Sequence, residues 1–228
     1  MAVPLARSQA IQSDSYNLYR PPMRILSLLL LAGAAWAQGD GWINIFPDAS
    51  FSQWTRISIP PGKPVSQPSQ WKIDAAAGTL VCEGNGGHEM LRYNTPYKDL
   101  VFHVEWKFTK LPDEKAKYNS GVFIRNDADG TIWHQAQTSL AGGYLFGNTP
   151  VNGVPKRFNL QPQMTENRVK PAGEWNTYDV TAKGHTISLS VNGKVVSEYT
   201  QTEILEGYVG LEAEGYRIEF RDIRVKPL

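Results

Sequence analysis

Two carboxylates stand close together near the end of the chain, Glu212 and Glu214 in the segment Gly-Leu-Glu-Ala-Glu-Gly at 210–215. Residues i and i+2 of a β-strand point to the same face, so both side chains would share one surface. Glycosidic bonds are commonly hydrolysed by two carboxyl groups about 5 to 10 Å apart, and these neighbours fall near the low end of that range. They would more often lie on one side of a sugar than flank it, so a solvated acidic strand is the alternative interpretation.

A second polar group lies at 131–138, which reads Thr-Ile-Trp-His-Gln-Ala-Gln-Thr. In a strand, Trp133, Gln135 and Gln137 share one face, and His134 takes the other. Amide side chains both donate and accept hydrogen bonds, and an indole stacks on the C–H face of a pyranose. The three residues therefore suit a sugar, and a polar edge strand is the alternative.

The segment 100–108 alternates between apolar and polar residues over its whole length. This period of two predicts a long strand with one buried side. His103 and Glu105 fall on the other side, where polar residues of a curved sheet become candidates for a binding groove. An ordinary solvated sheet face is the alternative.

Other chemistries find little support. Lys and Arg number 23 and Asp and Glu 22, so the formal charge of +1 offers no basic patch, and no nucleic-acid partner is expected. The segment Asn-Asp-Ala-Asp-Gly at 126–130 lacks the third acidic ligand of a calcium loop and is better explained as a hairpin turn. No group has metal-ligand spacing, no phosphate loop or dinucleotide fingerprint is present, and Cys82 lies in an apolar strand. We therefore expect neither a metal nor a cofactor.

Strands must position these candidates, because period-two alternation dominates from Asp40 onward. Asn192-Gly193 predicts a type I′ turn between two strands. Roughly a dozen such strands, without a clear helix, predict an all-β protein: an antiparallel β-sandwich or jelly roll formed by one domain over 38–228. Two stretches lack this strand pattern: a Pro-rich surface segment at 60–69 and a longer stretch at 149–171. We expect the second to be a loop that covers the site.

The first residues have the pattern of an export signal. Arg24 precedes an apolar run at 25–35, and Ala35-Trp36-Ala37 forms an A-x-A cleavage site. The run is shorter than the roughly 20 residues that a spanning helix needs, so no membrane insertion is expected. We predict a signal peptide within 1–37, a natural start at Met23, cleavage after Ala37, and a periplasmic or extracellular protein.

From about Gly41 to its end, the chain resembles the 3-keto-disaccharide hydrolase domain family. The matching pieces, singly weak but specific in this order, are 42–46 with Trp54, 71–73 with 78–80, 99–106, Asn-Ser-Gly-Val-Phe-Ile-Arg at 119–125, 173–176, 191–193, 210–211 and 220–225. The resemblance implies a concanavalin A-like jelly roll of the lectin and glucanase type. It also implies activity on 3-keto-disaccharides or related glucosides bound in a groove, so the expected partner is a carbohydrate.

Matching positions in this family implicate Glu105, Arg125 and Gln137. Two segments depart from the family pattern: the acidic residue of its E-x-Q strand is Gln135 here, and its closing L-Q-x-H-G reads Leu-Glu-Ala-Glu-Gly at 211–215. A 3-keto group acidifies the C2 proton, so one base and one cation can cleave the glycoside by elimination. We expect Glu105 or Glu212 as the base and Arg125 as the cation that stabilises the enolate.

The candidate catalytic residues are thus Glu105, Arg125 and Glu212. The candidate substrate-binding residues are His103, Trp133, Gln135, Gln137 and Glu214. The loss of a carboxylate at Gln135 favours a second hypothesis, in which the chain is a non-catalytic carbohydrate-binding module of the same fold.

Overall fold

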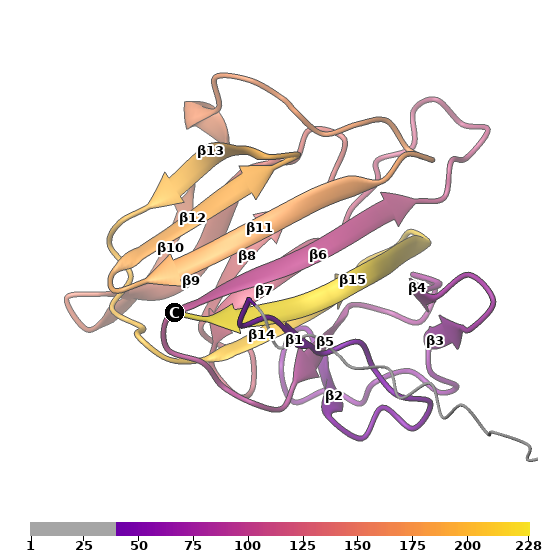
Figure 1. The fold of residues 1–228 in the computed structure, drawn as a ribbon, viewed down its shortest axis with the longest axis horizontal. Helices are drawn as coiled ribbons and strands as arrows, with labels where there is room; N and C mark the ends of the chain where they lie inside the picture. Colours follow the sequence, from indigo (N-terminus) through magenta and orange to yellow (C-terminus); the bar gives the residue numbers. More distant parts are fainter. Residues whose placement is uncertain (1–39) are drawn as a thin grey trace, which may run out of the picture. The chain divides into compact units, whose positions relative to one another are not determined.

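The computed structural model describes residues 40–228, and the predicted signal segment at 1–37 lies outside them. The described residues form two antiparallel β-sheets that pack face to face, with one short 3₁₀ helix at Gln161–Gln163 (Figure 1). This confirms the predicted all-β sandwich. Within residues 40–228, no helix is long and apolar enough to cross a membrane.

Sheet A carries the face turned to the viewer in Figure 1. Its strands follow the spatial order β13 (Lys194–Tyr199), β12 (Thr186–Val191), β11 (Asn176–Lys183), β6 (Leu100–Phe108), β15 (Ile218–Pro227), β4 (Thr79–Cys82) and β3 (Trp71–Asp74), while β1 (Ile43–Asn44) pairs with β15.

Sheet B lies behind sheet A in this view. Its spatial order is β10 (Val154–Asn159), β9 (Leu145–Val151), β8 (Trp133–Gln137), β7 (Gly121–Asn126), β14 (Tyr208–Ala213), β5 (Glu89–Tyr93) and β2 (Trp54–Ser58).

The hydrophobic core fills the space between the sheets, and β6 shows how the sequence builds it. The apolar residues of this strand, Leu100 to Phe108 at every second position, are at most 1% exposed. Trp106 packs edge-on against Phe108 and Tyr178, with ring centres 5.5 and 5.3 Å apart. The alternation in the sequence therefore predicts both the strand and its buried face, because a strand that covers a core must put one face against it.

The hairpin predicted at Asn192-Gly193 joins β12 to β13, and both turn residues have the positive φ that a type I′ turn requires. The same dipeptide, Asn152-Gly153, also has positive φ at both residues and forms the turn that joins β9 to β10. The first part of the stretch at 149–171, expected to be a loop, is therefore a hairpin that extends sheet B. Pro155 is compatible with β10 because this strand lies at the edge of the sheet.

Three register shifts interrupt the strand pairing of the described residues, one of them between β12 and β13. On β7, the three steps from Phe123 to Asn126 lie opposite two steps of β14, and Arg125 at this bulge has a φ of 50°. On β15, the three steps from Arg221 to Arg224 lie opposite two steps of β6, and Asp222 has a φ of 49°. A bulge changes which face the following side chains occupy.

Candidate functional site

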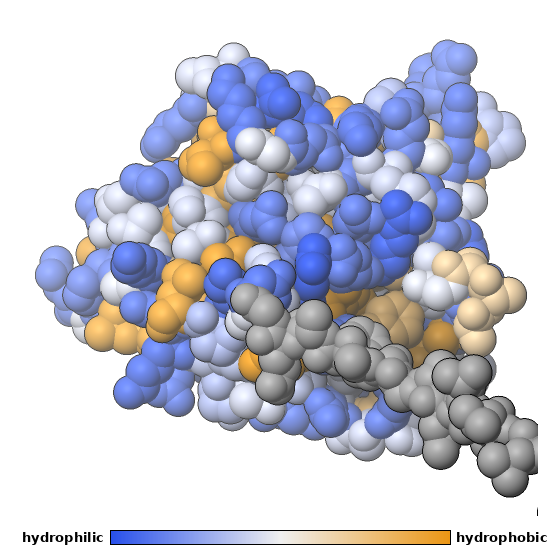
Figure 2. Space-filling model, in the orientation of Figure 1, coloured by the Kyte–Doolittle hydropathy of each residue, from blue (hydrophilic) through white to orange (hydrophobic). Residues whose placement is uncertain are grey.

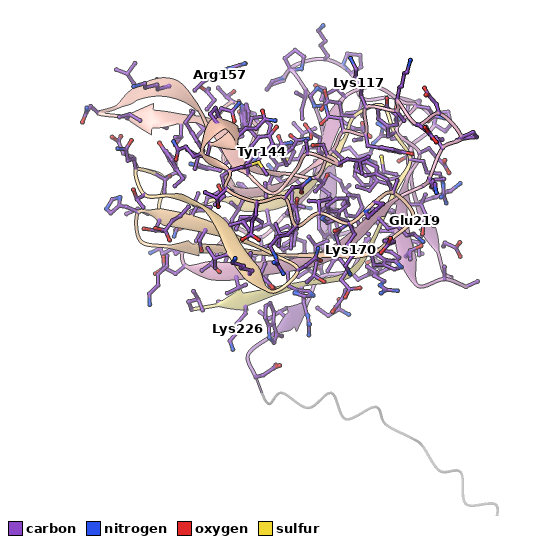
Figure 3. The ribbon with its side chains drawn as sticks, turned by 90° about the horizontal axis from the view of Figure 1, so that it is seen from above. Lys117, Tyr144, Arg157, Lys170, Glu219 and Lys226 are labelled. Atoms are coloured by element: carbon purple, nitrogen blue, oxygen red, sulfur yellow. The ribbon has the colours of Figure 1, made fainter. Side chains whose placement is uncertain are left out.

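A groove of about 760 Å³ runs over the outer face of sheet B. Side chains that point away from the core on six strands line it, together with the loops at 59–61 and 117–119. Figure 3 shows Lys117 and Arg157 on opposite sides of this face, with Tyr144 between them. The lining combines five aromatic residues with amides, cations and carboxylates, so the groove can both stack against a ring and hydrogen-bond to it.

Glu212 on β14 lies at the chemical centre of the groove. Its side chain is only 4% exposed, and Oε1 lies 2.7 Å from His88 Nε2. Gln135 donates a hydrogen bond from Nε2 to Glu212 Oε2 over 2.6 Å. Glu214 is more exposed and its Oε2 lies 3.9 Å from His88 Nε2. The predicted pair of carboxylates therefore shares one face and one imidazole.

The protonation of this cluster reflects its burial. Burial raises the pKa of Glu212, although hydrogen bonds from His88 and Gln135 act to lower it. Burial acts to lower the pKa of His88, but the hydrogen bond and the negative charge of Glu212, followed by the charge of Glu214, outweigh it and raise that pKa. Both pKa values therefore lie above their ordinary values, and the two side chains share one hydrogen bond.

Gly121 on β7 makes the contact between Gln135 and Glu212 possible. This glycine pairs with Gln137 on β8, and β14 lies on its other side. A Cβ atom at this position would lie 2.0 Å from Gln135 Nε2. The Gln135 side chain can therefore cross β7 only because residue 121 has no side chain.

Gln137 and Trp133 extend the polar and aromatic surface along β8. Gln137 Nε2 donates to Asn119 Oδ1 over 2.5 Å and to the Ser120 carbonyl over 3.1 Å. Trp133 packs edge-on between Phe123 and Phe146, with ring centres 6.5 and 5.1 Å away. The structure thus brings together five of the sequence candidates: Trp133, Gln135, Gln137, Glu212 and Glu214.

Arg125 does not reach the groove, which corrects the expectation that it stabilises the enolate there. Its side chain is fully buried, donates from Nη2 to Asp99 Oδ1 over 2.8 Å, and also binds the carbonyls of Lys98, Gly184 and Ile204. The β-bulge is the physical reason, since it turns Arg125 inward. Asn126 lines the groove.

His103 and Glu105 lie on the outer face of sheet A, on the opposite side of the sandwich from the groove. Arg221 donates from Nε to Glu105 Oε2 over 2.6 Å. The expectations that Glu105 acts as the base and that His103 binds the substrate are therefore also corrected, because neither residue lines the groove that holds Gln137. The alternation of β6 assigns them correctly to a non-core face, but it does not tell which sheet bears the groove.

Several groove residues were not among the sequence candidates, and His88 is the most important. It precedes β5, which pairs with β14, and this pairing brings it to Glu212 across 124 positions of the sequence. A histidine directly before a predicted strand is the only local signal. Lys117 and Tyr144 lie in connecting segments without a sequence pattern. Asn119 belongs to the matched segment 119–125 and Arg157 to the stretch expected to cover the site, but neither was singled out as a site residue.

Within residues 40–228, two groups of three side chains bring possible metal-ligand atoms within 4.8 Å of one another: His88, Glu212 and Glu214 in the groove, and His103, Glu105 and Asp222 on sheet A. In both groups the histidine nitrogen is already within 3.2 Å of a carboxylate oxygen. In the groove group, this contact allows His88 and Glu212 to share a proton.

The fold and the groove define a class, the concanavalin A-like β-sandwiches with a polar, aromatic-lined groove on one sheet. Within this class, the chain belongs to the 3-keto-alpha-glucoside-1,2-lyase-like domain family, whose model matches residues 41–226. This confirms the resemblance found in the sequence.

One curated relative and two solved structures are similar to this chain, the structures in fold alone. The chain is 26% identical over 237 residues to a 3-keto-disaccharide hydrolase of Bacteroides thetaiotaomicron, covering 83% of this chain and 79% of that protein. A putative glycosyl hydrolase of Parabacteroides distasonis has a similar fold, with a TM-score of 0.57, 17% identity, and coverage of 82% of this chain and 99% of that one. A carbohydrate-binding module of Bacillus subtilis matches with a TM-score of 0.56 and 13% identity over 76% of this chain and 95% of its own.

Proposed function

We propose that the protein cleaves glucosides whose sugar ring carries a 3-keto group, by elimination across C1 and C2. The single observation that carries this proposal is the convergence of Glu212, His88 and Gln135 in the groove of a chain that belongs to this family. These residues offer a base, a proton donor and an orienting amide at one place.

In the proposed reaction Glu212, in its ionised form, removes the C2 proton, which the neighbouring keto group acidifies. The electrons of the C–H bond form the enolate, and its collapse expels the glycosidic oxygen from C1 as the C1–C2 double bond forms. His88, when protonated, supplies the proton that the departing oxygen takes up. General acid and base groups of this kind typically contribute about 10² to 10⁴-fold to a rate.

The enolate needs a positive partner, and Arg125 is not available for that role. Lys117 lines the groove, and its backbone N–H donates to the Tyr216 hydroxyl over 3.0 Å, which places residue 117 beside the segment that follows Glu214. We assign the ammonium of Lys117 to the enolate oxygen in place of Arg125.

Release of p-nitrophenolate from p-nitrophenyl 3-keto-glucoside tests the proposal, with the glucoside that lacks the keto group as control. We expect release from the keto compound alone, loss of release in Glu212→Gln, and a primary isotope effect when deuterium replaces hydrogen at C2. Release without an isotope effect would indicate direct hydrolysis, and the absence of release would overturn the proposal.

A second candidate function is carbohydrate binding without catalysis. Gln135 supports it, because an amide at this position cannot exchange a proton, and so does the fold match to a carbohydrate-binding module. Calorimetric binding of 3-keto-glucosides without turnover would favour this alternative.

We also propose that the protein is exported, because the sequence at 1–37 has the pattern of a signal peptide. Sequencing the N-terminus of the protein recovered from the native cell tests this, with Gln38 as the expected first residue. An intact N-terminus in the cytoplasmic fraction would contradict it.

A further inference from the structure

At the end of the groove formed by β8, β9 and β10, three side chains lie in one row across the strands. The register places Trp133 of β8 beside Asn148 of β9, and Asn148 beside Arg157 of β10. All three line the groove. An indole, an amide and a guanidinium therefore stand side by side on one face, away from the catalytic cluster.

Arg157 differs from every other arginine of the described residues. Of the eight arginines in residues 40–228, seven have a side chain that forms an ion pair, a hydrogen bond or a stacking contact with an aromatic ring. Within this part of the chain, no carboxylate lies within 4.0 Å of the Arg157 guanidinium, and its side chain makes no hydrogen bond. Its five N–H donors remain free for a ligand.

The strand that carries Arg157 is held in place, although it lies at the edge of the sheet. The Phe158 ring stacks on Tyr199 with centres 3.8 Å apart and planes only 6° from parallel. The Glu203 carboxylate accepts hydrogen bonds from the backbone N–H groups of Asn152 and Gly153 in the adjoining turn. A guanidinium on a fixed strand loses less freedom on binding than one on a mobile loop.

We infer that this end of the groove binds a carboxylate on the unit attached to the glucosyl ring, with Arg157 as its partner. Arg157 and Glu212 belong to strands four spacings apart, roughly 19 Å along the sheet, so they contact opposite ends of a ligand at least two rings long. The acidic group therefore lies on the leaving unit. Guanidinium and carboxylate match in planar geometry and form paired charge-assisted hydrogen bonds.

The inference rests on the proposed function only in identifying which part of the ligand is the leaving unit. A binding experiment tests it without catalysis. The full chain is titrated calorimetrically at low salt with phenyl glucoside and with 4-carboxyphenyl glucoside, neither of which carries a keto group. We expect the acid to bind about tenfold more tightly. Arg157→Gln removes this preference, whereas Lys156→Gln retains it, because Lys156 has the same charge on the same strand but the opposite face.

A glucosyl-glucuronate disaccharide and its neutral counterpart form a second arm, which distinguishes a sugar acid from an aromatic acid. A preference in either arm that depends on Arg157 supports the inference. Equal affinity for acid and neutral ligand in both arms, a preference that survives Arg157→Gln, or no binding of any ligand at millimolar concentration overturns it. If the preference holds while 3-keto-glucosides are not cleaved, the proposed function fails and this site stands.

Discussion

The two outer faces of the sandwich each bring a histidine against carboxylates, but the carboxylates of the two faces differ in whether an arginine also pairs with them. On sheet A, His103 lies between two carboxylates, with Nδ1 2.7 Å from Asp179 and Nε2 3.2 Å from Asp222. Arg221 pairs with Glu105, and Arg224 lies 3.0 Å from Asp222. Figure 2 shows hydrophilic side chains over much of this face. Here Glu105 and Asp222 each have an arginine partner, and Asp179 contacts the imidazole.

In the groove, the corresponding carboxylates have no Lys or Arg partner within the described residues. Glu212 and Glu214 contact one imidazole and, for Glu212, one amide. A set of charges that neutralises itself gives a stable, hydrated surface, whereas a set with an excess of carboxylates is open to a proton or a ligand. Residue type alone therefore does not identify the site, whereas the partners of each residue do.

The largest expected difference between the faces is in catalysis. Glu212→Gln should lower kcat/KM for a 3-keto-glucoside by about 10² to 10⁴-fold, because it removes the base. Glu105→Gln, the same change on sheet A, should leave it within about twofold. Steady-state kinetics of both variants measures this. Equal losses in the two variants would contradict the assignment of catalysis to the groove and restore Glu105 as the base expected from the sequence.

Arg125 belongs to neither face, so its removal should affect stability alone. Arg125→Met removes the ion pair with Asp99 and leaves three backbone carbonyls without their donor. We expect the free energy of unfolding to fall by about 3 kcal/mol, with kcat of the folded protein nearly unchanged. Urea unfolding and kinetics below the transition measure the two effects. A loss of kcat with unchanged stability would instead indicate a role in catalysis.

Gly121→Ala tests the contact between Gln135 and Glu212 inside the groove. The new Cβ forces the Gln135 side chain away from Glu212, and we expect kcat to fall about tenfold, as in Gln135→Ala. The double variant should be no slower than either single variant, because both remove one interaction. Additive losses in this double-mutant cycle would contradict the assigned role of Gly121.

The smallest expected effect concerns pH. The negative charge of Glu214 raises the pKa values of Glu212 and His88. If Glu212 acts as the base, activity is lost as the pH falls through its raised pKa. Glu214→Gln should shift this acid limb to lower pH by a fraction of a unit. A pH profile of kcat/KM measures it, with Glu105→Gln as the variant that leaves the limb in place, and a shift to higher pH would contradict the sign.

The sequence by itself determined the sandwich, the strand at 100–108, the turn at Asn192-Gly193 and the shared face of Glu212 and Glu214. These features follow from local chemistry: alternation over a few residues, and the backbone freedom of Asn and Gly. It also identified the family, because the matching pieces keep their order along the chain.

Only the tertiary structure decided which of these residues form the site. The bulge at Arg125 reverses the alternation of β7, and no residue near it in the sequence predicts this reversal. His88 reaches Glu212 through the pairing of β5 with β14, and His103 lies on the other sheet. Strand pairing across more than a hundred residues depends on how the whole core closes, and a local pattern carries no information about it.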